Sequence, residues 1–178
     1  MRDLPLMLWL VSLVVVAAIV LAAYISRQRV RRTLATEGME GRLLYSDANR
    51  RGAVLKCESL GLKGKPDYVF EHDGQLIVIE RKKREVTNQR PYEGELLQIA
   101  AYCVLAEERF GNEVKVGRLQ YLNETIDVPF TAELRQRMVA TLEQMRRAEQ
   151  AGEAHRSHHR RNACAKCGFK SRCGEALA

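Results

Sequence analysis

Two acidic side chains and a lysine gather around one short segment, residues 64–84, "GKPDYVFEHDGQLIVIERKKR". The Asp-Gly pair at 73–74 is a strong hairpin signal, and a two-residue turn there places Asp67 opposite Glu80. Opposed carboxylates, with Cβ atoms about 4.5–5.5 Å apart, repel each other unless a cation such as Mg²⁺ or Mn²⁺ binds between them. Lys82 shares a strand face with Glu80, so its ammonium can orient an attacking water. The segment predicts a metal-dependent hydrolytic site, and a hairpin with solvated charges is the simpler alternative.

Three cysteines near the C-terminus form a second group with the chemistry of metal ligands. Cys164, Cys167 and Cys173 stand in a C-x₂-C-x₅-C pattern within "CAKCGFKSRC". Three thiolates at this spacing can hold a metal ion or an iron–sulfur cluster together with one further ligand. The spacing does not separate a cluster from tetrahedral zinc, so zinc is the alternative. Cys103 lies within a helical pattern, and we expect it to be a buried thiol.

The elements that must position these groups are short strands and two helices. The expected strands are residues 54–59, 67–72, 75–82, 114–122 and 126–130. Apolar residues recur at helical spacing over 93–110, and Gly111 ends that helix. A second helix begins at Thr131, and its apolar stripe is Leu134, Met138, Leu142 and Met145. This order predicts a small α/β domain whose sheet begins with antiparallel strands.

The N-terminal region differs in composition from the rest of the chain. From Leu4 to Ile25 there is no charged residue, and about 22 residues at about 1.5 Å rise reach about 33 Å. That length is enough to cross a bilayer in contact with membrane lipid. Arginines follow the run at positions 27, 29, 31 and 32, which favours a single-pass anchor with its N-terminus outside and the remainder in the cytoplasm. A cleaved signal peptide is the alternative, but its positive charges would precede the apolar run.

The remaining chain has the size of one domain and a basic composition. The sequence has 178 residues and a net charge of +7, and its five cysteines all follow residue 53. A reducing cytoplasm favours free, catalytic or metal-binding cysteines over disulfides. Basic residues in 81–90 and 135–172 are typical of a surface that binds a polyanion such as nucleic acid, although a solvated surface is the commoner outcome. We expect residues 1–32 to form the anchor and its basic flank, 33–53 a linker, and 54–178 the functional domain.

The hairpin and the helix that follows it resemble the RecB-like branch of the PD-(D/E)XK nucleases. The letters "PD" at 66–67 and "ERK" at 80–82 form the PD-(D/E)XK signature, and Gln98 and Tyr102 give the Q-x-x-x-Y pattern within "QIAAY". The two residues are four apart and share one helix face. The resemblance implies a restriction-endonuclease-like core, with a central mixed sheet flanked by helices and a divalent ion between the two acids. It also implies that Gln98 and Tyr102 lie beside this ion and contact DNA or position the catalytic groups.

The cysteine-rich tail is similar to that of RecB-like nucleases of the CRISPR-associated Cas-four type and of the related replicative helicase-nuclease. In those proteins an upstream cysteine joins three C-terminal cysteines around a [4Fe–4S] cluster, which ties the two ends of the domain together. The resemblance implies such a cluster on Cys164, Cys167 and Cys173, with Cys57 as the fourth ligand because it alone precedes the hairpin. The rival fourth ligands are His155, His158 and His159.

One residue of the family pattern has no counterpart in this sequence. The family carries an upstream histidine that also binds the catalytic ion, whereas no histidine precedes His72 here. Glu58 is close in sequence to the hairpin, and it is the acid that we expect to take this place. Two acids, a main-chain carbonyl and waters can still hold Mg²⁺, but more weakly.

Together these observations predict a membrane-anchored deoxyribonuclease that depends on Mg²⁺ or Mn²⁺, and the resemblance favours an exonuclease. The two opposed acids would hold the ion, and Lys82 would position the attacking water. Three basic residues are expected to bind the DNA backbone with little sequence preference: Lys83, Arg84 and Arg90. An inactive nucleic-acid-binding or redox-sensing module of the same fold is the alternative that the missing histidine favours. A zinc-stabilised adaptor at the membrane is a further alternative.

Overall fold

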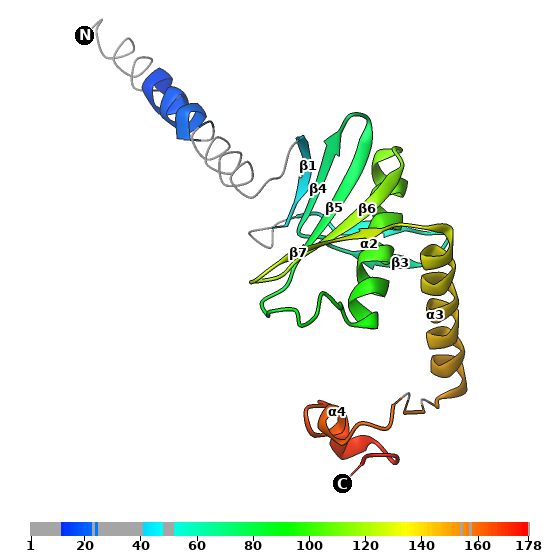
Figure 1. The fold of residues 1–178 in the computed structure, drawn as a ribbon. Helices are drawn as coiled ribbons and strands as arrows, with labels where there is room; N and C mark the ends of the chain where they lie inside the picture. The colour runs from blue at the N-terminus through cyan, green and yellow to red at the C-terminus, as the bar shows by residue number, and fades with distance from the viewer. Residues whose placement is uncertain are drawn as a thin grey trace, which may run out of the picture.

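A five-stranded mixed sheet is the centre of the computed structural model, which describes residues 12–22, 24, 41–47, 52–153, 155–156 and 158–177 (Figure 1). In sheet order the strands are β1 (Arg42–Ser46), β4 (Tyr68–His72), β5 (Gln75–Arg81), β6 (Val114–Gln120) and β7 (Thr125–Pro129). A separate two-stranded hairpin consists of β2 (Leu55–Cys57) and β3 (Leu62–Gly64). The helices are α2 (Glu93–Phe110), α3 (Ala132–Ala151), α4 (Arg161–Ala165) and the 3₁₀ turn η1 (Lys170–Arg172). The expected α/β class and mixed central sheet are confirmed.

The β4–β5 hairpin has the register that the sequence predicts. Asp73 and Gly74 both have positive φ angles, 49° and 75°, as a type I′ turn requires. The pairing runs from His72↔Gln75 to Tyr68↔Ile79. Because the next residues in this register are Asp67 and Glu80, the two acids leave the hairpin side by side at its open end.

Helix α2 covers one face of the sheet and connects β5 to β6, which pair in parallel. It crosses from β5 to β6, as a parallel connection requires. Its bounds match the prediction, and Gly111 ends it with a left-handed φ of 78°. The apolar face of α2 buries Ile99, Ala100 and Cys103 in the main core between helix and sheet.

A glycine on β6 allows α2 to approach the sheet closely. A Cβ atom at Gly117 would lie 2.4 Å from Ile99 Cγ1 and 3.1 Å from Cys103 Sγ. Contacts below 3.0 Å cannot be relieved here by a flexible chain end, because both neighbours are buried in the core. Cys103 therefore packs as a buried thiol, as predicted, and burial raises its pKa far above the usual value.

The small β2–β3 hairpin fixes the outer side of α2. Gly64 lies against the Tyr102 ring, since a Cβ there would stand 2.7 Å from Tyr102 Cε1. Arg146 of α3 donates to the carbonyl of Leu60 in the β2–β3 turn. The sheet, α2 and this hairpin thus form successive layers, and α3 packs against α2.

Residues 42–46 were expected within a linker, but they form the edge strand β1. The strand pairs antiparallel with β4, and its register shifts between Leu43 and Tyr45. That irregularity removes the strict alternation of buried and exposed residues by which a strand is recognised in a sequence. Part of the expected linker therefore belongs to the sheet.

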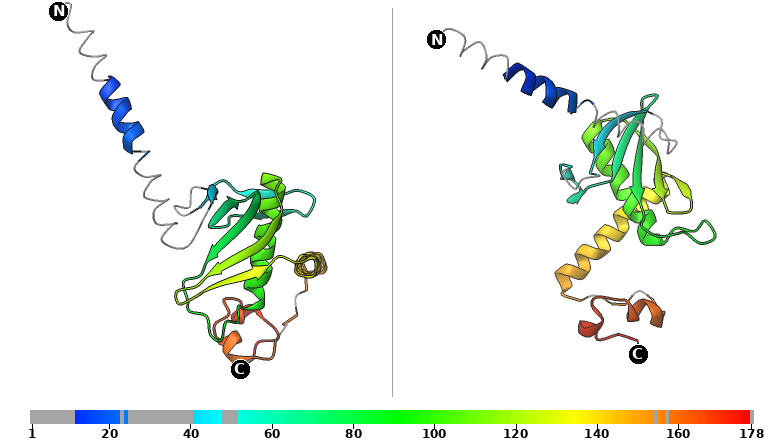
Figure 2. Two further views of the ribbon diagram at one scale, coloured as in Figure 1. Left: turned by 45° about the horizontal axis from the view of Figure 1, so that its top comes forward. Right: turned by 90° about the vertical axis from the view of Figure 1, so that its left-hand side faces the viewer.

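Helix α3 begins as predicted but leaves the domain before it ends. Leu134 N donates to Thr131 Oγ1 at 3.2 Å, which is the expected N-cap. Leu134 and Met138 are buried, whereas Met145 is 64% exposed, so only the first half of the predicted stripe packs. The second half carries the C-terminal segment away from the sheet (Figure 2).

The expected membrane span over residues 4–25 extends beyond the described residues at both ends. Residues 12–22 are helical, and their large apolar side chains are 51–68% exposed. Among the residues that the structure describes, none belongs to a helix both long and apolar enough to cross a bilayer.

Candidate active site and cysteine cavity

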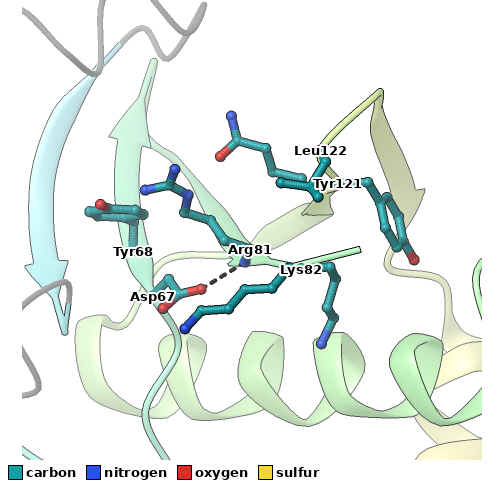
Figure 3. Close-up of a pocket in the computed structure, with 8 residues that line it drawn as sticks. Asp67, Tyr68, Arg81, Lys82, Tyr121 and Leu122 are labelled. Carbon is teal, nitrogen blue, oxygen red and sulfur yellow. Dashed lines mark hydrogen bonds between the residues drawn. The ribbon is translucent and has the colours of Figure 1, made fainter. Parts of the chain in front are cut away.

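The five residues of the predicted nuclease site meet at the open end of the β4–β5 hairpin. Asp67 comes from the residue before β4, Glu80 from β5 and Lys82 from the residue after β5, while Gln98 and Tyr102 come from α2. Asp67 Oδ2 accepts a hydrogen bond from the backbone N–H of Arg81 at 2.7 Å (Figure 3). The side chain of Lys82 extends toward Asp67, whereas that of Arg81 turns to the other side, as strand alternation predicts.

A chain of hydrogen bonds connects Glu80 to the two helix residues. Lys82 Nζ donates to Glu80 Oε1 at 3.2 Å and to Gln98 Oε1 at 2.6 Å. Gln98 Nε2 donates to Glu80 Oε1 at 3.2 Å and to the Tyr102 hydroxyl at 3.1 Å. Both ends of the Gln98 amide are therefore used, and its orientation is fixed by its partners. Lys82 and Glu80 are held in place before any ligand binds.

The site has more acidic than basic side chains, with Asp67 and Glu80 beside Lys82. Burial raises the pKa of Glu80, the nearby Lys82 ammonium lowers it, and the charge of Asp67 raises it further, so that the net shift is upward. Burial also raises the pKa of Tyr102, and the charges of Glu80, Asp67 and Asp47 add to this shift. Excess negative charge in a partly buried place is stabilised when a cation binds.

A cavity of about 550 Å³ opens beside these residues. Its lining includes Asp67, Lys82 and Lys83 from the hairpin side and Tyr121 and Leu122 from the β6–β7 turn (Figure 3). Leu122 is 72% exposed at the rim. The cavity is large enough for a nucleotide, and two of the predicted catalytic residues, Asp67 and Lys82, line it.

The three residues predicted to bind the DNA backbone differ in their surroundings. Lys83 and Arg90 are exposed, and Lys83 lines the cavity. Arg84 is instead occupied within the protein, because its Nε and Nη2 donate to Glu95 Oε1 and Oε2 at 3.1 and 2.6 Å. Its guanidinium also stacks 4.0 Å from the Tyr92 ring centre and 4.9 Å from that of Tyr121. Arg84 thus attaches the loop after β5 to the start of α2.

An acid close to the site that the sequence analysis missed is Asp47, which precedes the hairpin. Its backbone N–H donates to the Asp67 carbonyl at 3.0 Å, and its carboxylate contributes to the raised pKa of Tyr102. The Asp47 carboxylate accepts from Gly52 N at 2.7 Å and lies 3.5 Å from Lys65 Nζ. Glu58, expected in this role, is exposed in the β2–β3 turn. Asp47 follows β1 directly, so it could be found only by recognising that strand.

Two carboxylates on adjacent strands are the hard oxygen donors that Mg²⁺ and Mn²⁺ take, so the pair Asp67 and Glu80 fits a divalent ion that keeps several waters. In the described part of the chain, no three His, Cys, Asp or Glu side chains are grouped closely enough to bind a metal by themselves. A site on this pair therefore needs water or substrate oxygens to complete it.

The C-terminal cysteines meet at a separate cavity of about 210 Å³. Cys164, Cys167 and Cys173 line it together with His155 and His158. Thiolates and imidazoles are the donor types that zinc and iron–sulfur clusters take, but within the described residues these side chains are not grouped closely enough to hold a metal ion.

Cys57, the expected fourth ligand, is not among the residues that line this cavity. It is 2% exposed within the main core, and its Sγ lies 3.2 Å from Ser59 Oγ. The proposed tie between the hairpin region and the tail is therefore not formed in this structure, because β2 holds Cys57 against α2.

Comparisons with known proteins show what this chain is similar to. The model of the PD-(D/E)XK nuclease superfamily matches residues 9–174. The chain is 26% identical over 146 residues to a CRISPR-associated exonuclease Cas4 of Francisella tularensis subsp. novicida (strain U112), covering 82% of this chain and 70% of that protein. It is 31% identical over 143 residues to a CRISPR-associated exonuclease Cas4/endonuclease Cas1 fusion of Myxococcus xanthus (strain DK1622), covering 75% of this chain and 25% of the fusion. Among solved structures, the crystal structure of SSO0001 has a TM-score of 0.43 and 18% identity, covering 66% of this chain and 52% of that one.

Proposed function

Because the chain belongs to the PD-(D/E)XK nuclease superfamily, and its relatives include Cas4 exonucleases, we propose that it is a DNA exonuclease dependent on Mg²⁺ or Mn²⁺. The observation that carries the proposal is the hydrogen-bonded set of Glu80, Lys82 and Gln98, with Asp67 and Lys82 lining the adjacent cavity. Asp67 and Glu80 carry like charges, and their mutual repulsion is relieved when a cation binds between them.

Each side chain has a definite task in this proposal. A divalent ion between Asp67 and Glu80 would polarise the scissile phosphate and activate water for attack. Lys82 holds the attacking water and offsets charge that develops on the phosphate. Gln98 keeps Lys82 and Glu80 in position through its two hydrogen bonds, and Tyr102 supports Gln98.

The substrate is held by its phosphates rather than by its bases. Lys83 is exposed at the cavity rim and Arg90 is exposed on the loop that follows β5. Such contacts add affinity without sequence preference and weaken with salt. Arg84 takes no part in this, because Glu95 and two tyrosine rings already engage its guanidinium.

A [4Fe–4S] cluster on Cys164, Cys167 and Cys173 is the second part of the proposal. It is supported by the resemblance to Cas4 exonucleases and by the three cysteines that line one cavity. Zinc remains the alternative group, and iron, sulfide and zinc content per chain distinguish the two.

Membrane anchoring through residues 4–25 is the third part. It is supported by the absence of charge over these residues and by the exposure of the apolar side chains of residues 13–21. The protein should then stay in the membrane fraction after high-salt and carbonate washes. Recovery of the full-length chain in the soluble fraction would contradict the anchor.

The nuclease proposal is tested by a cleavage assay on the full chain, purified without oxygen in mild detergent. DNA should be degraded with Mn²⁺ or Mg²⁺ and left intact with a chelator. The variant Lys82→Met, of similar size, should lower the rate by at least about 10²-fold, while its circular dichroism stays that of the parent. A wild-type protein that binds DNA but does not cleave it with either ion would instead support the inactive binding module.

A further inference from the structure

Arg84 and Glu95 connect the loop after β5 to the first turn of α2. Arg84 Nε and Nη2 donate to the two carboxylate oxygens of Glu95 at 3.1 and 2.6 Å, which makes the ion pair bidentate. The Tyr121 hydroxyl and the Tyr92 backbone N–H donate to Glu95 Oε2 at 2.8 and 2.9 Å. Burial opposes the charge of Glu95, but these hydrogen bonds hold the pKa of its carboxyl below the usual value. Four donors thus occupy the carboxylate, which leaves it little capacity for a metal ion or another ligand.

The loop is also attached to the turn between β6 and β7. The backbone N–H of Lys82 donates to the Gln120 carbonyl at 2.7 Å. The backbone N–H of Leu122 donates to the Arg84 carbonyl at 3.1 Å. The backbone on both sides of residue 83 is therefore held by one turn, and the Arg84 side chain reaches from there to α2.

These contacts lie next to the Lys82–Gln98 hydrogen bond of the candidate active site. Arg84 is two residues after Lys82, and Glu95 is three residues before Gln98, less than one turn of α2. Between the two ends of the ion pair the chain follows residues 85–92, most of which are exposed. The ion pair therefore joins directly the two segments whose side chains meet at 2.6 Å, from Lys82 Nζ to Gln98 Oε1.

The ion pair should matter more for geometry than for stability. The side chains of Arg84 and Glu95 are 32% and 13% exposed, and ion pairs that water reaches add little to the stability of a fold. A displacement of about 1 Å in a catalytic group, in contrast, can lower a rate about 10²-fold. Loss of the pair should therefore affect the position of Lys82 before it affects the fold.

We infer that Arg84 is a positioning residue, because its bidentate pair with Glu95 keeps the Lys82 ammonium at the candidate active site. A guanidinium is required, since its planar fork bonds both carboxylate oxygens and stacks 4.0 Å from the Tyr92 ring centre, whereas a lysine offers a single point charge. The effect of Arg84 on cleavage rests on the proposed nuclease function, but its effect on Lys82 does not.

The first measurement needs no cleavage and follows the acetylation rate of Lys82 by mass spectrometry, in the full chain purified in mild detergent. In the wild type, the Lys82 side chain is 14% exposed and should react more slowly than the exposed Lys83. In Arg84→Met and in the nearly isosteric Glu95→Gln, the rate for Lys82 should rise severalfold toward that of Lys83. Circular dichroism and melting temperature verify that both variants are folded.

The second measurement separates positioning from DNA binding in the cleavage assay. Arg84→Lys keeps the positive charge that a phosphate contact would need but loses the planar fork. It should lower kcat by at least about 10-fold and leave the KM for DNA near that of the wild type. A raised KM with an unchanged kcat would instead assign Arg84 to the DNA backbone and overturn the inference.

Arg118→Lys is the matched control, because Arg118 forms a similar bidentate pair with Asp127 between β6 and β7, at 2.6 and 2.9 Å. It should change neither the acetylation of Lys82 nor kcat. Unchanged acetylation of Lys82 in folded Arg84→Met and Glu95→Gln would overturn the inference. If the wild type cleaves no DNA with Mn²⁺ or Mg²⁺, the nuclease proposal fails, while the acetylation rates still decide whether Arg84 positions Lys82.

Discussion

The nuclease site and the cysteine cavity both contain candidate metal ligands, but the fold holds the side chains of the nuclease site more firmly. Glu80, Lys82 and Gln98 are joined by hydrogen bonds, and the Lys82 and Glu80 side chains are only 14% and 12% exposed. The metal-ligating candidates of the tail are more open, since Cys167 is exposed and the His155 side chain is 78% exposed. The first site is organised by the sheet and α2, whereas we expect the second to become rigid only when it binds its proposed metal group. Substitutions in the core and removal of the tail metal should therefore affect different parts of the protein.

The largest effect on stability should come from the glycine that brings α2 to the sheet. Gly117→Val places a side chain where a Cβ alone would lie 2.4 Å from Ile99 Cγ1, so we expect the free energy of unfolding to fall by about 1–3 kcal/mol. Chemical denaturation measures it. Gly94→Ala, at an open position of α2, is the matched control and should be neutral or stabilising. Metal content of the tail should not change in either variant. If Gly117→Val lost tail metal as well as core stability, the two regions would not be independent.

Removal of the tail metal should affect only the tail. If Cys57 is not a ligand of the proposed metal group, stripping that group with a chelator should expose residues 152–177 to protease while the sheet and α2 keep their melting temperature. The physical reason is that no ligand comes from the core. Limited proteolysis with mass spectrometry locates the cuts, and calorimetry follows the core. A fall in the melting temperature of the core on chelation would instead favour Cys57 as a ligand, because that bond would connect β2 to the tail.

A smaller effect should appear in the pH dependence of stability. Burial raises the pKa of Glu80, so its ionised form is less favourable in the folded chain than in the unfolded one. The contribution of Glu80 to stability is therefore greatest below the usual carboxyl pKa and decreases as pH rises through the raised pKa. Metal-free Glu80→Gln should match the wild type at low pH and exceed it at neutral pH. Thermal melts across pH measure this difference. A variant less stable than the wild type at neutral pH would show that the attraction between Lys82 and the Glu80 carboxylate outweighs the cost of burying that charge.

Local patterns in the sequence were enough to predict the hairpin and most of the helices. Asp73 and Gly74 determine a tight turn by their backbone preferences alone, and the turn determines which residues oppose each other. The apolar spacing of α2 and the N-cap Thr131 act within a few residues in the same way. This is why Asp67, Glu80 and Lys82 could be brought together from local patterns, whereas Gln98 and Tyr102 were added by the resemblance to RecB-like nucleases.

The features that were missed depend on contacts between distant segments. Strand β1 is defined by its pairing with β4, and its shifted register hides it in the sequence, so Asp47 was overlooked as well. In the sequence Arg84 looks available to bind DNA, but in the fold Glu95 and Tyr121 contact its guanidinium. Cys57 was predicted as a cluster ligand because it was the only cysteine upstream of the hairpin, and its burial against α2 could not be foreseen from the sequence.

The most direct test of the central claim is a Mn²⁺ titration followed by DNA cleavage in the same samples. We expect the wild type to bind Mn²⁺ at the hairpin and to cleave, and Asp67→Asn and Glu80→Gln to lose both properties. Lys82→Met should still bind Mn²⁺ while its cleavage falls by at least about 10²-fold, because Lys82 acts on water and phosphate rather than on the ion. Glu58→Gln is the control and should behave as the wild type. Equal Mn²⁺ binding and cleavage in wild type and Asp67→Asn would contradict the account.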